Sequence, residues 1–457
     1  MSSPIQALVI GAGISGLVCA HALRNAGLDA RVVEASSQPG GVIRSERRDG
    51  YLLEYGPQSF NATQVVRDLC RDLEIDGQML VAPAGAPRFV LLDGKLRAVP
   101  FSPLAFIKSP LFGIGTKCAI LLDVAGRSAP PDAEESIAAF VRRKFSAELL
   151  EKLVGPFVSG IYAGDPERLG LRSAFLQLYE AEKSAGSVIR GLGRGGKKNG
   201  GPSEKPAVTT FRDGNQTFID ALTASLGSNL RCNTEALSVR RSSGVPSRFE
   251  VVLRTNGQDE VVTVGRLILA TPTAQTAALL RGVDAAFETL LATVEYAPIA
   301  VVSLGYKRDA VRHDLNGFGF LVPRSAKLRI LGSVWNSSLF PARAPDGHVL
   351  LTSFVGGVTD PAAVELPDTE LVAAVHRELK PILGLSQEPS FSSVWVYRRA
   401  IPQFNVGHAE KMSRIVTMLS HYPGLHLTGN YLRGPAWAAC IEQALSVAEE
   451  ACKQAMT

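Results

Sequence analysis

The stretch ALVIGAGISGLVCAHALRNAGLDARVVEAS, residues 7–36, decides the fold of this 457-residue chain. It opens with a continuous apolar run, as expected for a parallel strand that is buried on both faces. Gly11, Gly13 and Gly16 follow in a GxGxxG pattern, which allows a tight turn, close approach of the backbone to a pyrophosphate, and close packing of the next helix. A second strand ends at Glu34, whose carboxylate can accept both ribose hydroxyls. The pattern predicts a Rossmann-like unit that binds a dinucleotide.

The residues around this glycine pattern are the predicted nucleotide contacts. The N–H groups at the start of the first helix, together with the positive end of its dipole, would face the phosphates. The predicted contacts in this stretch are Gly11, Ala12, Gly13, Ile14, Ser15, Gly16, Glu34 and Ala35.

The next segment, QPGGVIRSERRDGYLLEYGPQSF (38–60), distinguishes FAD from NAD as the cofactor. Its glycine pair, Gly40 and Gly41, followed by Arg44, resembles the extension that flavoproteins of the amine oxidase superfamily place over the FAD pyrophosphate. The arginine would add a charge-assisted contact to phosphate. The alternative is an ordinary turn. The sequence holds no second glycine pattern of this kind, so we expect non-covalent FAD and no NAD(P)H site.

Composition bounds the class of protein. Apolar residues make up 46% and charged residues 20% of the chain, which is typical of a globular protein with an ample core. The net charge of +5 is mild, and the one basic run, GRGGKKNGG (193–201), is interpreted as a solvated loop, so no nucleic-acid partner is expected. The six scattered cysteines indicate reduced thiols in the cytoplasm. No signal peptide is expected before the first strand, and no apolar run reaches the ~20 residues of a membrane span.

The order of apolar patterns predicts an α/β protein of three domains. We expect a Rossmann-like FAD domain assembled from residues 1–86, 208–272 and 425–457. A helical domain over 87–207 would be inserted between the first two segments and would serve membrane binding and substrate entry. A mainly antiparallel α+β substrate domain is expected over 273–424, because strand-like runs there alternate with turns.

Several phrases of the sequence together resemble one family. They are GGVIRS, LEYGPQSF, PRFVLLDGKLRAVP, SGIYAGDPERLGLRSAF, GFGFLVP, TSFVGG and IPQFNVGH. They look like the protoporphyrinogen oxidases of the oxygen-dependent FAD type, with the related coproporphyrinogen III oxidases as near neighbours. The resemblance runs from residue 5 to about 450. It implies six-electron oxidation of protoporphyrinogen IX to protoporphyrin IX in haem biosynthesis, in which FAD accepts hydride and oxygen regenerates it with release of hydrogen peroxide.

The resemblance also assigns substrate contacts. Arg88 would bind a propionate, for which a planar guanidinium is better suited than an ammonium. Leu321, Val334 and Phe354 would sandwich the rings, and the carbonyl of Gly160 would accept pyrrole N–H groups. By composition alone these positions are a surface arginine, ordinary strand residues and a glycine at a helix end.

Further FAD contacts follow from the same resemblance. Around the pyrophosphate and the flavin edge they are Val42, Arg44, Gly56, Pro57, Gln58 and Ser59. Val239 would use its backbone for adenine, and Tyr397 would lie near the flavin. No metal ligands are expected, and no catalytic acid or base is assigned, because the flavin can carry the chemistry itself.

Near the C-terminus the chain reads HLTGNYLRGPAWAACIEQAL (426–445). Gly429 and Asn430 are expected to end the last FAD-domain strand, and Pro435 to occupy the first position of the final helix. The N–H groups of Ala436 and Trp437 would then face the flavin edge, where reduced flavin is negative. Relatives commonly read close to GNxYxGVGxxDC, so the effect of this departure on the flavin is left open.

The family is peripheral to membranes, and residues 99–123 could lie in the membrane interface. The sequence-based expectation is a cytoplasmic protein on the inner membrane face that acts on a porphyrinogen with molecular oxygen. A homodimer is compatible with it. Three alternatives stay open: a coproporphyrinogen III oxidase, a flavin amine oxidase, and a porphyrin carrier that retains flavin without catalysis.

Overall fold

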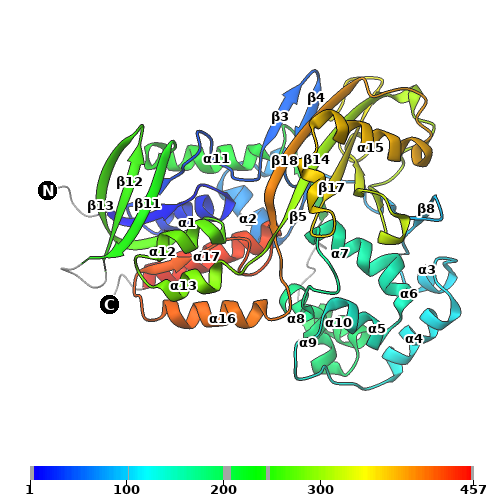
Figure 1. Ribbon diagram of the computed structural model, residues 1–457, viewed down its shortest axis with the longest axis horizontal. Helices are drawn as coiled ribbons and strands as arrows, with labels where there is room; N and C mark the ends of the chain where they lie inside the picture. Colours follow the sequence, from blue (N-terminus) through cyan, green and yellow to red (C-terminus); the bar gives the residue numbers. More distant parts are fainter. Residues whose placement is uncertain (1–4, 101, 199–206, 243–247, 454–457) are drawn as a thin grey trace.

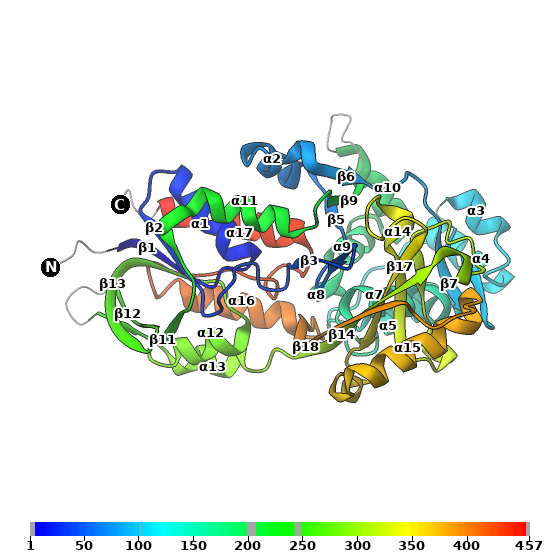
Figure 2. The same ribbon diagram turned by 90° about the horizontal axis from the view of Figure 1, so that it is seen from above.

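The computed structural model has a nucleotide domain at one end and, at the other end, a substrate sheet above a lobe of helices (Figure 1). Figure 2 shows the same two ends separated along the long axis. The structure describes residues 5–100, 102–198, 207–242 and 248–453. This arrangement confirms the predicted α/β fold, with an FAD-type domain assembled from separate segments of the chain.

The nucleotide domain is built on a seven-stranded sheet of order β10-β2-β1-β13-β12-β11, with β19 also paired to β13. Its strands are β1 (Ile5–Ile10), β2 (Ala30–Val33), β10 (Leu230–Arg231), β11 (Thr234–Arg241), β12 (Phe249–Thr255), β13 (Gln258–Leu269) and β19 (Leu425–Leu427). Strand β1 runs parallel to both β2 and β13, and its residues 7–10 are buried, as its continuous apolar run predicts.

Helices cover both faces of this sheet. One face carries α1 (Ile14–Asn25), α2 (Gln64–Asp72), α11 (Gln216–Leu226) and α17 (Trp437–Lys453). The other face carries α12 (Thr273–Leu280), α13 (Ala285–Leu291) and α16 (His408–Leu419). The sequence assigns these last three helices to the substrate domain, whereas in the structure their apolar faces share the core of the nucleotide sheet.

The substrate sheet also has seven strands, in the order β18-β14-β17-β16-β15-β7-β8. They are β18 (Phe391–Pro402), β14 (Tyr296–Lys307), β17 (His348–Gly356), β16 (Ile330–Trp335), β15 (Gly319–Leu321), β7 (Arg88–Leu92) and β8 (Lys95–Ala98). Only the β15–β7 pair is parallel, so the sheet is mainly antiparallel, as predicted. Strands β7 and β8 come from the segment predicted as helical. Helix α15 (Asp368–Leu383) covers one face, and α14 (Asn336–Leu339) follows β16.

The helical lobe holds α3 (Pro103–Lys108), α4 (Ile114–Ala125), α5 (Ile137–Lys144), α6 (Ala147–Leu149), a π-helical turn (Leu150–Val154), α7 (Gly155–Tyr162), α8 (Leu171–Ala174), α9 (Leu176–Ala185) and α10 (Val188–Lys198). Helix α10 contradicts the interpretation of residues 193–198 as a loop, and the rest of that basic run lies outside the described residues.

Buried charges hold this lobe together. The Lys144 ammonium lies 2.6 Å from the Asp123 carboxylate and 3.5 Å from that of Glu182, and all three side chains are buried. Burial alone would raise the pKa of Asp123, but the ion pair with Lys144 and hydrogen bonds to the start of α10 hold it below its usual value.

Two small sheets connect the larger parts. One is the hairpin of β3 (Ser45–Arg48) and β4 (Tyr51–Glu54), and the other has the order β5-β9-β6, from Phe60–Ala62, Ala207–Phe211 and Met79–Val81. Tyr51 of the hairpin stacks on Phe391 of β18, with ring centroids 4.4 Å apart. The hairpin therefore lies on the substrate sheet although its chain neighbours belong to the nucleotide domain.

Candidate functional site

The glycine turn forms a cradle, residues 11–16, between the end of β1 and the start of α1. Gly11 has φ +103°, a conformation that residues with side chains rarely adopt. A Cβ at position 16 would lie 1.9 Å from the Gly11 carbonyl oxygen, so only glycine lets α1 pack this closely. A Cβ at Gly13 would meet nothing within 4 Å. The structure thus leaves open space in front of the helix start.

The start of α1 is suited to an anion. Its N-cap residue, Gly13, offers no side chain to the first N–H groups, and the first turn carries no acidic residue. The amides of Ile14, Ser15 and Gly16 have no intrahelical partner at this end, and the helix dipole is positive there. Open space, unsatisfied donors and missing acids together fit the pyrophosphate of FAD.

Glu34 is held beside this cradle. One carboxylate oxygen accepts the N–H of Ala12 at 2.8 Å, and the other accepts the N–H and the hydroxyl of Ser36 at 3.0 and 2.7 Å. A carboxylate oxygen can accept more than one hydrogen bond, so ribose hydroxyls can still bind. Ala35 follows directly. Val239 lies buried on β11.

The second glycine pair lies against the first. The Gly40 N–H donates to the Ala12 carbonyl at 2.8 Å, and Gly13 and Gly40 form a parallel bridge. Gly40 and Gly41 both have positive φ, of 116° and 61°. The predicted covering segment therefore runs beside the cradle, directly against Ala12 and Gly13, and Val42 and Arg44 follow it.

Arg44 belongs to an aromatic stack that the sequence did not reveal. Its guanidinium lies 5.0 Å from the centre of the Trp395 ring, and Tyr55 stacks on the same tryptophan with centroids 4.6 Å apart. The Tyr397 hydroxyl donates to the Val42 carbonyl at 3.4 Å. Trp395 thus orients the predicted phosphate-binding arginine. Local pattern could show only that WVY is an aromatic strand.

The loop from Gly56 to Ser59 passes close to the same segment. A Cβ at Gly56 would lie 1.9 Å from the Val42 carbonyl oxygen, so this glycine is required for the approach. The Gln58 amide donates to the carbonyls of Glu54 and Gly56 at 2.8 and 3.0 Å and accepts from Asn336 at 2.7 Å. Its side chain is therefore committed to the protein, and a contact from Gln58 to FAD would come from its backbone.

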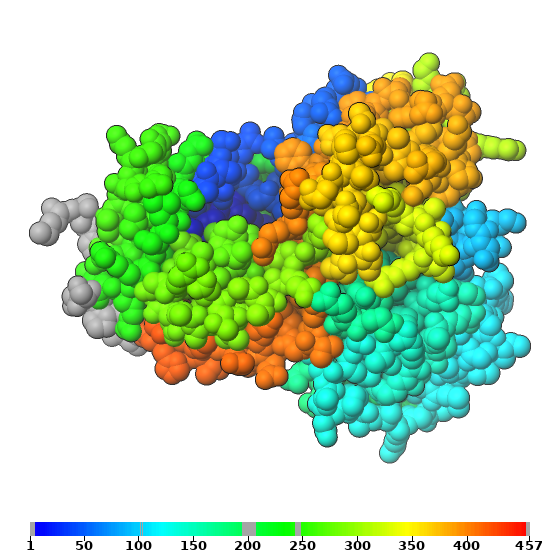
Figure 3. Space-filling view, in the orientation of Figure 1, coloured from blue at the N-terminus to red at the C-terminus, as the bar shows by residue number. Residues whose placement is uncertain are grey.

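A buried ion pair joins the nucleotide domain to the substrate domain. Arg343 and Glu54 approach to 3.4 Å, and each side chain is only 2% exposed. Glu54 also accepts from the Ser45 hydroxyl at 2.6 Å and the Asn215 N–H at 2.9 Å, while Arg343 donates to the Phe211 carbonyl at 2.9 Å. Burial raises the pKa of Glu54, and the neighbouring guanidinium opposes that shift. In Figure 3 the blue N-terminal segment is set back between the two domains that this pair connects.

The pairing of the substrate sheet places most of the predicted substrate residues on one face, here called the substrate face. Residues paired across strands share a face, as does every second residue along a strand. One row of this face runs through Trp395, Val301, Phe354, Gly332, Leu321 and Val90. The adjoining row runs through Ser393, Ser303, Thr352, Val334, Gly319 and Arg88. Tyr397 shares this face two residues beyond Trp395, and α15 covers the opposite face.

Gly160 and Arg88 lie at the border of the substrate face. A Cβ at Gly160 would come within 2.6 Å of the Leu321 Cδ2 atom, so α7 touches the face there and a larger residue would displace the Leu321 side chain. Arg88 begins β7, and its guanidinium lies 5.0 Å from the Phe318 ring centre. Partial burial lowers the pKa of Arg88, which remains a cation. The structure thus brings the predicted substrate residues into one region.

The C-terminal segment differs in detail from the expectation. Helix α17 begins at Trp437, so Pro435 precedes the first helical position by two residues, and the Ala436 carbonyl accepts the first intrahelical bond from Cys440 at 3.0 Å. The Trp437 ring is 5% exposed and stacks on Phe60 with centroids 4.4 Å apart. The ring therefore belongs to the core of the nucleotide domain, and the backbone N–H of Trp437 stays the predicted contact to the flavin edge. Gly429, with φ +152°, and Asn430 follow β19 after one intervening residue, Thr428.

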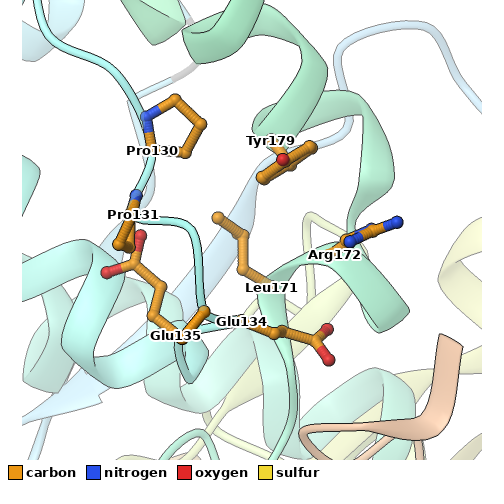
Figure 4. A pocket seen from close by; sticks show the side chains of 8 residues that line it. Pro130, Pro131, Glu134, Glu135, Leu171, Arg172 and Tyr179 are labelled. Carbon is orange, nitrogen blue, oxygen red and sulfur yellow. The ribbon is translucent and has the colours of Figure 1, made fainter. Parts of the chain in front are cut away.

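Other candidate sites are poor. The described residues contain no cluster of three or more His, Cys, Asp or Glu side chains that could hold a metal ion. The hollow in Figure 4, lined by Pro130, Pro131, Ala133, Glu134, Glu135, Leu171, Arg172 and Tyr179, belongs to the helical lobe and includes none of the predicted site residues. Its volume of about 10 Å³ admits roughly one water molecule.

Comparison with known proteins agrees with this geometry. The family described as flavin containing amine oxidoreductase matches residues 14–456. The chain is 36% identical to the chloroplastic protoporphyrinogen oxidase of Oryza sativa subsp. japonica, over 97% of this chain and 87% of the relative. It is 28% identical to the coproporphyrinogen III oxidase of Bacillus subtilis strain 168, over 97% of each chain.

Solved structures share the fold. A protein of Exiguobacterium sp. 255-15, assigned to the protoporphyrinogen oxidases, superposes with a TM-score of 0.83 at 24% identity, over the full length of both chains. Wild-type putrescine oxidase with bound putrescine gives a TM-score of 0.71 at 18% identity, over 99% of each chain. The family and the fold together confirm FAD as the cofactor, whereas the individual contact residues stay predictions.

Alanine substitutions at two of the cradle glycines should have different effects on stability and on FAD binding. We expect Gly13→Ala to fold with wild-type thermal stability in the absence of FAD, because the new methyl group meets no protein atom, but to bind FAD at least about tenfold more weakly. Gly16→Ala should lose stability before any cofactor is added, because its Cβ collides with the Gly11 carbonyl. Calorimetry of the apoprotein and titration with FAD would separate the two, and equal FAD affinity in Gly13→Ala and wild type would contradict the assignment.

Buried His408 should make stability depend on pH. Its Nε2 lies 2.8 Å from the Tyr431 carbonyl, and burial lowers its pKa from 6.5 to about 4, so the folded protein binds fewer protons than the unfolded chain between these values. The contribution of His408 to the free energy of unfolding is complete above pH 6.5 and falls by up to about 3 kcal/mol as the pH drops to 4. His408→Gln should flatten this slope in denaturant unfolding, whereas the exposed His421→Gln should not. An unchanged slope in His408→Gln would rule out this residue as the source.

Proposed function

The chain belongs to the flavin containing amine oxidoreductase family, and we propose that within it the protein oxidises protoporphyrinogen IX to protoporphyrin IX in haem biosynthesis. It is an FAD-dependent oxidase, and oxygen is the proposed acceptor. The high coverage of relatives named protoporphyrinogen oxidase supports this substrate class.

The observation that carries the proposal is the composition of the substrate face. Leu321, Val334 and Phe354 provide an apolar surface, while Arg88 provides a cation at its border. A porphyrinogen is a large apolar macrocycle with carboxylate side chains, and it needs both kinds of contact. A simple amine cation without a carboxylate would be repelled by the arginine.

The residues of the chain then have separate tasks. The cradle at 11–16 and Glu34 hold the cofactor, and Arg88 fixes the substrate by a carboxylate. When bound, FAD would supply the electron-accepting chemistry. The amides at the start of α17 would favour negative charge at the flavin edge. We assign no catalytic acid or base, so tautomerisation of the substrate would proceed without one.

Protoporphyrinogen IX is favoured over coproporphyrinogen III as substrate. The identity to the rice protoporphyrinogen oxidase exceeds that to the Bacillus coproporphyrinogen oxidase. Coproporphyrinogen carries four carboxylates rather than two and would need more cations around its rim. Among the residues in the two rows of the substrate face, Arg88 is the single cation.

Anaerobic mixing tests the function directly. We expect protoporphyrinogen IX to bleach the flavin absorbance of the purified protein, and admission of oxygen to restore it with release of hydrogen peroxide. Faster bleaching by coproporphyrinogen III would identify that compound as the preferred substrate. Bleaching by amines alone would indicate an amine oxidase. Porphyrin binding without bleaching would indicate a carrier.

Matched arginine variants locate the substrate in steady-state assays of the same oxidation. Arg88→Ala should raise the KM for the porphyrinogen by about ten- to hundredfold, the value of a lost bond to a charged group. Arg377→Ala should have no effect, because Arg377 lies exposed on α15, across the sheet from the substrate face. An unchanged KM in Arg88→Ala would remove this residue from the substrate site.

We also propose that the protein attaches peripherally to the inner, cytoplasmic face of a membrane. None of the helices in the described residues is long and apolar enough to cross a bilayer. Large apolar side chains nevertheless stand exposed on α3 and α4: Leu104 (62%), Ile107 (52%), Ile114 (80%), Leu121 (57%) and Leu122 (71%). Such side chains with neighbouring lysines suit an interfacial location and support the predicted role of 99–123.

Vesicle flotation tests the attachment. We expect the wild-type protein to float with anionic phospholipid vesicles, and the double variant Ile114→Glu, Leu122→Glu to bind at least about tenfold more weakly, because both side chains would leave the apolar phase. Val416→Glu is the control, since Val416 is also a largely exposed apolar residue (60%) but lies on α16 of the nucleotide domain. Wild-type protein that stays at the bottom of the gradient would refute the proposal.

A further inference from the structure

Two stretches far apart in the sequence, 159–173 and 401–409, lie against each other where the helical lobe meets the rest of the protein. The Gly170 N–H donates to the Phe404 carbonyl at 2.9 Å, and an antiparallel bridge and a further main-chain bond join their neighbours. These stretches hold two of the phrases by which the chain resembles its family. Their contact shows that both phrases serve the same junction, just beyond the end of α7.

Gln403 is the centre of this junction. Its side-chain amide donates to the Tyr162 carbonyl at 2.8 Å and to the Ile401 carbonyl at 3.0 Å, and the residue is only 2% exposed. The side-chain oxygen lies close to Gly164, where a Cβ would come within 2.6 Å of it. Gln403, which directly follows β18, therefore holds the last residue of α7 in place by a hydrogen bond.

A second contact holds the next residue. Ala163 caps α7 in the left-handed conformation, with φ +47°, which is unfavourable for a residue other than glycine. Its carbonyl accepts the Val358 N–H at 2.9 Å, and Gly357 leaves the room for this approach. Gln403, just after β18, and Val358, just after β17, thus hold the strained end of the helix.

These contacts leave particular carbonyls of α7 available. The Ser159 carbonyl accepts the Ala163 N–H, and the carbonyls of Tyr162 and Ala163 are occupied as described. No hydrogen bond to the Gly160 or Ile161 carbonyl is found from the described residues that follow the helix. A helix end exposes such carbonyls at the negative end of its dipole, where they attract N–H donors.

We propose that Gln403 is a positioning residue for the substrate, which fixes the end of α7 so that the Gly160 carbonyl faces the N–H groups of the macrocycle. Gly160 already contacts Leu321 of the substrate face, so a small rotation of α7 would change both the acceptor and the apolar surface. The proposal rests on the proposed function. It adds that recognition of the pyrrole N–H groups depends on a side chain that does not itself touch the substrate.

The test is Gln403→Met, which keeps the length of the side chain and removes its donor. We expect the KM for the porphyrinogen to rise about fivefold to tenfold, with kcat within about twofold of wild type and with FAD affinity unchanged. Amide hydrogen exchange should become faster over residues 155–164. Gln387→Met is the matched control, because Gln387 is exposed and lies outside the junction.

The outcomes separate a positioning role from a structural one. An unchanged KM with unchanged exchange at 155–164 would overturn the proposal. So would a common fall in thermal stability, FAD affinity and kcat without a change in KM, since that describes a generally weakened fold. If the wild type itself fails to oxidise a porphyrinogen, the proposed function is wrong. Faster amide exchange over residues 155–164 in Gln403→Met would then still establish that Gln403 holds the end of α7.

Discussion

The buried pair of Glu54 and Arg343 is the constraint on which the relation of cofactor and substrate depends. It joins the hairpin β3–β4, the segment that leads into α11, and the loop after α14, which are distant in the sequence. Removing one partner of such a pair typically costs about 3–5 kcal/mol, because the other charge stays buried. The pair therefore does more than add stability. It positions the loop at Gly56 and Gln58 against the substrate sheet. The hydrogen bond from Asn336 to Gln58 is a second link between the same parts.

Sequence reasoning could predict the fold because the signals of the fold are local. The GxGxxG turn needs Gly11 and Gly16 for reasons contained within a single strand and helix, and the apolar runs of the substrate sheet have strand character wherever they pair. The domain boundaries and the supporting residues could not be predicted in this way. Trp395, Arg343 and Gln403 are an ordinary aromatic, arginine and glutamine until strands from other parts of the chain come to lie beside them.

The C-terminal segment has a structural role for Trp437 that pattern alone did not show. Trp437 fills a gap between Phe60 and Phe218 in the core of the nucleotide domain, with ring centroids 4.4 and 5.1 Å away. The large ring belongs to packing, while the backbone amide next to Ala436 keeps the place where charge on the flavin would be stabilised. The packing of the side chain and the expected electrostatic role are therefore compatible, because they use different atoms of the same residue.

The interleaving of the chain also bears on how the protein is made. Strand β7 leaves the ribosome early, yet its parallel partner β15 follows only after the helical lobe and most of the nucleotide sheet, and β19 and α17 come last. Neither large sheet can therefore be completed until most of the chain has been synthesised. Such long-range pairing slows folding and leaves apolar strands exposed in the nascent chain. The FAD domain is therefore complete only once β19 and α17 have been synthesised, although its glycine cradle lies at the opposite end of the sequence.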